Sequence, residues 1–101
     1  PGVDGPARQR RKLSHVGIIM AQVLLDEHGK LADDIDIILD GVPEGLAEEL
    51  AIAGEKAVDS MQKNRRKEDE MVEETVRTAI RRTADMAWGK KPVVKVFVAR
   101  V

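Results

Sequence analysis

Side chains that commonly perform chemistry are few in this 101-residue chain, and their spacing assembles no catalytic group. The chain has no cysteine, and its two histidines are His15 and His28. Neither histidine stands in a His-x-His or His-Glu-x-x-His pattern, the arrangements that typically bind zinc. Ser14 and His15 are neighbours on an expected strand, where they point to opposite faces and cannot pair as nucleophile and base. We therefore expect no catalytic residue, no metal ligand and no cofactor in this chain.

A row of aspartates raises the question of a divalent-cation site: Asp33, Asp34, Asp36 and Asp40. An EF-hand loop needs a glycine at its sixth position and a glutamate at its twelfth, and the spacing here does not match that pattern. Aspartates that alternate with isoleucines along an edge strand more commonly protect that edge from pairing with another sheet. We interpret these aspartates as the solvated side of an edge strand.

Two basic clusters are candidates for contact with the phosphate groups of RNA. They are Arg8, Arg10 and Arg11 near the start of the chain, and Lys63, Arg65, Arg66 and Lys67 in an expected turn. Arg81 and Arg82 on the following helix would extend the second cluster. The alternatives are a solvated hinge and a salt-bridged helix surface. The net charge is −1 and the aromatic residues are Trp88 and Phe97, so RNA binding would rest on charge and not on base stacking.

The longest apolar run, residues 16–25, lies within a strand predicted over residues 13–27, and it indicates that this strand is buried on both faces. A half-solvated strand would alternate apolar and polar residues, whereas this run has a single polar side chain, Gln22. A domain of this size has helices enough to cover one face of its sheet, so the second face requires a partner. An apolar patch of this kind marks an interface. The residues that we expect to form this self-association surface are Ile18, Met20, Leu24 and Phe97.

The remaining patterns complete an α+β fold. They predict a second strand over residues 31–40, helices over 46–62 and 68–88, and a third strand over 93–101. The order ββααβ predicts a three-stranded mixed sheet, ordered second-first-third, with two antiparallel helices packed on one face. Gly54 is expected to let the first helix approach its neighbour closely, and Gly89 to end the second helix. Residues 1–11 predict a linker or arm, and residues 12–101 the folded domain.

Several short segments, in a fixed order, carry a resemblance to a known family. They are Arg10-Arg11-Lys12-Leu13 leading to Gly17, Leu25-Asp-Glu-His-Gly-Lys-Leu31, Gly41-Val-Pro-Glu44, the basic turn with Val76-Arg77, and Trp88-Gly-Lys-Lys-Pro-Val93. Their order and spacing resemble the C-terminal domain of ribonuclease J in its proteobacterial form. In that family the domain is a three-stranded sheet facing two helices, and it supports self-association and full activity of the enzyme.

The resemblance implies a parent enzyme of the metallo-β-lactamase and β-CASP group. Such an enzyme is a zinc-dependent ribonuclease with 5′-to-3′ exonuclease and endonuclease action in RNA processing and decay. The family's His-x-His-x-Asp-His zinc motif does not occur in this sequence, so no catalytic or zinc-binding role passes to its residues. Residues 1–11 would join this domain to the lactamase and β-CASP domains, and the chain alone would not be an enzyme.

Two other functions remain open from the sequence: an electrostatic RNA-binding module that uses the basic clusters, and a stand-alone dimeric adaptor. The chain has no cysteine, and we find no signal peptide or membrane-spanning run in it. We therefore expect a cytoplasmic protein with no membrane partner.

Overall fold

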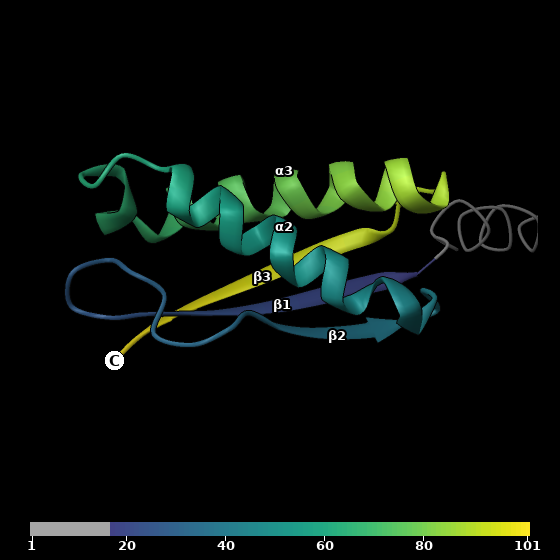
Figure 1. Cartoon of the computed structure of the whole chain (residues 1–101), viewed down its shortest axis with the longest axis horizontal. Coiled ribbons are helices and arrows are strands. Elements are labelled where there is room, and N and C mark those ends of the chain that lie inside the picture. Colours follow the sequence, from purple (N-terminus) through teal and green to yellow (C-terminus); the bar gives the residue numbers. More distant parts are fainter. Residues whose placement is uncertain (1–16) are drawn as a thin grey trace, which may run out of the picture.

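The computed structural model describes residues 17–101, which form two layers, a sheet and a pair of helices (Figure 1). The strands are β1 (Ile18–Leu25), β2 (Asp36–Asp40) and β3 (Val93–Arg100), and the helices are α2 (Ala47–Ser60) and α3 (Asp69–Trp88). Two short 3₁₀ turns, η1 (Glu44–Leu46) and η2 (Arg65–Lys67), precede α2 and α3. The α+β class is confirmed.

The long apolar strand lies at the centre of the sheet, as its composition predicts. The strand order is β2-β1-β3, and β1 pairs antiparallel with β2 and parallel with β3. Figure 1 shows α2 and α3 running in opposite directions over the same side of this sheet. The parallel pairing of β1 with β3 requires a long crossover, which the two helices provide. The predicted topology and strand order are confirmed.

The hydrophobic core fills the space between the sheet and the helices. Alternate residues of β1, beginning at Ile19, point into it, and they meet one apolar stripe from each helix. The fully buried members are Ile19, Val23, Leu25, Leu50, Val58, Val72, Val76, Ile80 and Ala84. Burying one aliphatic side chain of this size stabilises the fold by about 1.5–3 kcal/mol. This core fixes which face of the sheet the helices cover.

Gly54 allows α2 to approach the sheet and α3 closely, as the sequence predicts. A Cβ atom at this position would lie 2.9 Å from Cδ1 of Ile35 and 3.4 Å from Cγ1 of Val76. Gly89 ends α3 with a left-handed φ of 79°, and its N–H donates a hydrogen bond to the carbonyl of Asp85. Glycine adopts this conformation without the steric cost that a Cβ atom would impose.

The second strand is shorter than predicted. Residues 31–40 were expected to be extended throughout, but β2 begins at Asp36, and Leu31 makes only an isolated bridge with Leu25. The N–H of Ile35 donates to Glu55 Oε2 (3.0 Å) on α2, and the Ile35 side chain is buried in the core. This contact with α2 draws the segment before β2 out of the sheet ladder. The first strand likewise ends at Leu25 rather than at residue 27, and its expected start at residues 13–16 lies outside the described residues.

Candidate functional site

The face of the sheet opposite the helices is the candidate functional site, and we call it the open face. Side chains alternate across a strand, so residues paired in register point to the same face. The register therefore gives four rows across β2, β1 and β3. These rows are Asp40–Ile18–Val93, Ile38–Met20–Lys95, Asp36–Gln22–Phe97 and, on two strands, Leu24–Ala99.

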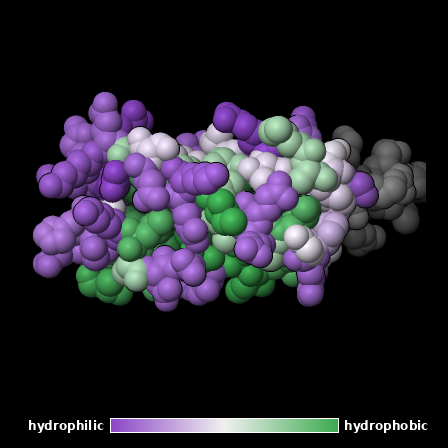
Figure 2. All heavy atoms as spheres, viewed as in Figure 1, coloured by the Kyte–Doolittle hydropathy of each residue, from purple (hydrophilic) through white to green (hydrophobic). Residues whose placement is uncertain are grey.

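Large apolar side chains on the open face are in contact with solvent. Ile38 retains 59% of its accessible surface and Phe97 retains 54%, while Ile18, Met20 and Leu24 are half-buried by their neighbours. Within residues 17–101, both helices lie on the other side of the sheet. Figure 2 shows hydrophobic side chains gathered along the edge of the molecule where Figure 1 places the strands. Contiguous exposed apolar surface of this kind is typical of interaction sites.

The structure brings together on the open face all four residues that the sequence singled out: Ile18, Met20, Leu24 and Phe97. Their role as an interface stays a prediction. Sequence reasoning missed two members of the same face, Ile38 and Val93. In residues 31–40, Ile38 lies at an even-numbered position, as do Asp36 and Asp40. Its place in this alternation could have identified it as a member of the open face.

Charges on the open face are separated from one edge to the other. Asp36 and Asp40 lie on β2, whereas Lys95 lies on β3, with the apolar residues of β1 between them. All three charged side chains are exposed. The face is therefore an apolar strip with one acidic edge and one basic edge.

The expected basic turn lies at η2, where Arg66 differs from its neighbours. Arg66 Nε and Nη2 donate to the carbonyl of Met61 at 3.0 and 2.9 Å, and Nη2 also donates to the carbonyl of Asp59 at 3.3 Å. These carbonyls lie at the C-terminal end of α2, which lacks intrahelical partners for them. Arg66 is half-buried, while Lys63, Arg65 and Lys67 are exposed.

The candidate RNA contacts are not all collected at this turn. Arg8, Arg10 and Arg11 lie outside the described residues. Arg81 lies 12 residues beyond the start of α3, which corresponds to about 18 Å along the helix axis. The structure therefore separates Arg81 and Arg82 from the turn. The expected RNA contact through Lys63, Arg65, Arg66 and Lys67 stays a prediction, with the Arg66 guanidinium already engaged by backbone carbonyls.

The turn that follows β1 packs against η2 and is organised by Asp26. Oδ1 of Asp26 accepts hydrogen bonds from the backbone N–H groups of His28 (2.8 Å) and Lys30 (2.9 Å). The bond from Lys30 is the main reason that the pKa of Asp26 lies below its ordinary value of 3.8, and the bond from His28 adds to it. A Cβ atom on Gly29 would lie 3.2 Å from Cβ of Arg66, so this turn sits tightly on η2.

A metal-binding site was also sought among the described residues. Within residues 17–101, no three histidine, cysteine, aspartate or glutamate side chains are grouped so that they could hold a metal ion. Asp36 and Asp40 lie at the two ends of the edge strand β2, and Asp33 and Asp34 lie in the segment that precedes it. In the same part of the chain, no helix combines the length and hydropathy that crossing a membrane requires.

Comparison with known proteins shows the family to which this chain belongs. Residues 7–101 match the model of the ribonuclease J C-terminal domain family. The chain is also 38% identical over 99 residues to a protein from Sinorhizobium meliloti named ribonuclease J, an alignment that covers 92% of this chain. The same alignment covers 18% of that relative, so this chain spans less than a fifth of its length. On the evidence of the family match, this chain belongs to the ribonuclease J C-terminal domain family.

Proposed function

We propose that this chain is the non-catalytic C-terminal domain of a ribonuclease that joins two copies of its parent enzyme through the open face. The single observation that carries the proposal is the open face itself, an apolar strip between charged edges that no helix within residues 17–101 covers. Family membership supports a ribonuclease as the parent, and the S. meliloti relative is named as one. A second copy is the simplest partner, because it is always present at the same concentration.

The parent reaction that we propose is zinc-dependent 5′-to-3′ exonucleolytic and endonucleolytic cleavage of RNA. The described residues provide no group that fits zinc, so the metal would be held by lactamase and β-CASP domains outside this chain. In the parent, zinc would supply an activated water for hydrolysis of a phosphodiester bond. The contribution of this domain is then to position and pair those domains, which is how it would support activity.

The size of the open face sets the strength of the association. Three strands spaced as in ordinary sheets, the longest of eight residues, span about 14 Å by 26 Å. That is roughly 370 Å² in projection, well below the ~800 Å² per partner of a standard stable interface. We therefore expect a weak dimer for the isolated chain, with a dissociation constant on the order of micromolar or above. In a parent with further contacts between copies, linkage raises the effective concentration and strengthens the same association.

The charges on the open face select one orientation of the two copies. If the two-fold axis runs parallel to the strands, β3 of one protomer covers β2 of its partner. Lys95 then lies near the two aspartates of the partner's β2 strand, and the apolar residues of β1 face one another. An axis perpendicular to the strands would instead place the aspartates of both copies together, which is electrostatically unfavourable. The edge-to-edge charge separation therefore supports the first arrangement.

Sedimentation velocity over a concentration series tests this proposal. We expect the 101-residue chain to show a monomer–dimer equilibrium, and Phe97→Glu to shift it strongly toward monomer because a carboxylate would be buried in the interface. Met86→Glu is the matched control, because Met86 is 81% exposed on α3 and away from the open face. A chain that stays monomeric at the highest soluble concentration would refute the proposal. Equal effects of the two substitutions would refute the assignment to the open face.

A further inference from the structure

The charges of this chain are distributed very unevenly. Although the net charge is −1, residues 77–100 hold seven lysines and arginines and one acidic residue, Asp85. Sixteen of the 18 acidic residues lie within residues 26–74. The basic segment comprises the C-terminal part of α3, the connection to β3 and β3 itself. Arg77 and Arg100 are each paired with an acidic residue, and Lys95 lies on the open face. The remaining cations lie near the end of α3 and in the connection to β3.

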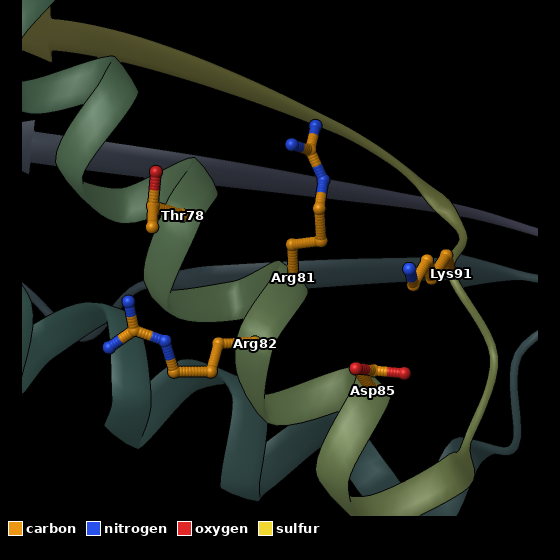
Figure 3. Close-up of a pocket in the computed structure, with 5 residues that line it drawn as sticks. All are labelled: Thr78, Arg81, Arg82, Asp85 and Lys91. Atoms are coloured by element: carbon orange, nitrogen blue, oxygen red, sulfur yellow. The ribbon is translucent and has the colours of Figure 1, made fainter.

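A surface hollow lies within this basic segment, on the outer side of α3 (Figure 3). It has a volume of about 290 Å³ and is lined by Thr78, Arg81, Arg82, Asp85 and Lys91. Each of these side chains ends in a polar or charged group. The aliphatic parts of these side chains form much of the surface of the hollow, but no aromatic or large apolar residue lines it.

The cations around the hollow are available to a ligand. Figure 3 shows Arg81 and Arg82 leaving α3 in different directions, with Lys91 approaching from the segment that leads to β3. Among the described residues, the ion pairs involve other groups: Arg77 with Glu74, Arg100 with Asp69, and His28 with Glu27. Neither Arg81 nor Arg82 is paired with a carboxylate there. The carboxylate of Asp85 is also present at the hollow and would repel an anion.

We infer that this hollow binds the phosphodiester backbone of single-stranded RNA. The planar guanidinium groups of Arg81 and Arg82 match the paired oxygens of phosphate, and Lys91 adds a third positive charge. The Thr78 hydroxyl is a neutral donor on the same helical surface. Trp88 is the one tryptophan of the chain, and its side chain is half-buried. The Lys90 ammonium lies over the Trp88 ring, 5.1 Å from the ring centre. Recognition therefore rests on backbone charge and is independent of base sequence.

The hollow and the open face can be occupied at the same time. α3 packs on the helix-covered face of the sheet, so its outer surface lies on the far side of the molecule from the open face. RNA bound at Arg81 and Arg82 would not displace a second protomer. The choice of RNA among polyanions rests on the proposed function, but the hollow does not depend on dimerisation. The two proposals therefore succeed or fail in separate measurements.

Salt-dependent binding of a fluorescently labelled oligouridine to the 101-residue chain tests this inference. Three phosphate contacts contribute a slope of about −2 to the plot of log affinity against log salt, which is roughly a 20-fold loss between 50 and 200 mM. Replacing Arg81, Arg82 and Lys91 together by Gln should remove that contribution. Asp85→Asn should instead strengthen binding, by roughly threefold, because it removes a negative charge beside the phosphate. A merely structural role for these residues would not produce a gain.

The matched comparison changes two cations in each variant: Arg81→Gln with Arg82→Gln should lower the slope, whereas Lys30→Gln with Lys56→Gln, at exposed positions that neither proposal uses, should retain it. Sedimentation velocity of each variant checks that association through the open face is unchanged. An unchanged slope in the α3 variant would overturn the inference, as would an equal loss in the Lys30 and Lys56 control. The RNA assignment would also be overturned if polyglutamate competed as effectively as unlabelled oligouridine at the same charge concentration, or if Asp85→Asn weakened binding.

Discussion

Replacing Arg66 by Ala tests whether this residue has a structural role rather than one in ligand binding. The substitution removes the three hydrogen bonds that its guanidinium donates to the carbonyls of Met61 and Asp59 at the end of α2. A hydrogen bond to a charged group contributes about 1.5–3 kcal/mol, and bonds that share one half-buried guanidinium are not additive. We therefore expect the free energy of unfolding to fall by about 2 kcal/mol.

Urea denaturation followed by circular dichroism measures this loss. For a domain of this size, about 2 kcal/mol corresponds to a melting temperature lower by about 8–16 °C and a urea midpoint lower by about 1–2 M. Arg65→Ala is the matched control, because Arg65 is exposed and makes no side-chain hydrogen bond to the described residues. We expect it to change stability by less than about 0.5 kcal/mol. Arg66→Lys should recover only part of the loss, because an ammonium cannot reproduce the fork of Nε and Nη2. Equal losses for Arg65→Ala and Arg66→Ala would refute this reasoning.

Three further predictions concern other parts of the structure. Gly17→Ala should destabilise the fold by about 1–3 kcal/mol in a urea titration, because the new Cβ would lie 2.9 Å from the carbonyl oxygens of Asp40 and Gly41; an unchanged midpoint would contradict this. The pKa of Asp26 is lowered by its bonds from Lys30 and His28, so the stabilisation of this turn is complete above pH 3.8 and is lost as the pH falls through the folded value. An NMR titration of the carboxyl group should therefore give a midpoint below 3.8, and a midpoint at or above 3.8 would refute it. Lys95→Asp should weaken the dimer roughly tenfold if two symmetry-related ion pairs contribute about 0.7 kcal/mol each. The combined change of Lys95→Asp, Asp36→Lys and Asp40→Lys should restore it, and no recovery would exclude the proposed orientation.

The sequence predicted the parts of the fold that depend on patterns along the chain. A run with apolar residues on both faces identified β1 as the central strand, and the alternation of its residues divided Ile18 and Met20 from the core positions Ile19 and Ala21. These are consequences of strand geometry alone. Gly54 and Gly89 were likewise predicted, because close helix packing and a left-handed helix end each favour glycine.

The features that were missed depend on where residues lie in three dimensions and not on a repeating pattern along the chain. The start of β2 is set by the bond from Ile35 to Glu55, which are 20 residues apart in sequence. The engagement of Arg66 depends on where the carbonyls of Met61 and Asp59 lie when α2 ends. Ile38 was overlooked as part of the open face because its neighbours Asp36 and Asp40 suggested a purely solvated side. Local patterns cannot supply such information.

The central claim is that two copies meet through their open faces, and an isotope-filtered NMR experiment tests it most directly. A mixture of labelled and unlabelled chains reports only the contacts between protomers. Phe97 is the single phenylalanine of the chain, so its ring signals are easily assigned. We predict cross-peaks between the Phe97 ring of one protomer and the Ile38 methyl groups of its partner. Intermolecular contacts confined to Met86 and other residues of the helix layer would contradict the account.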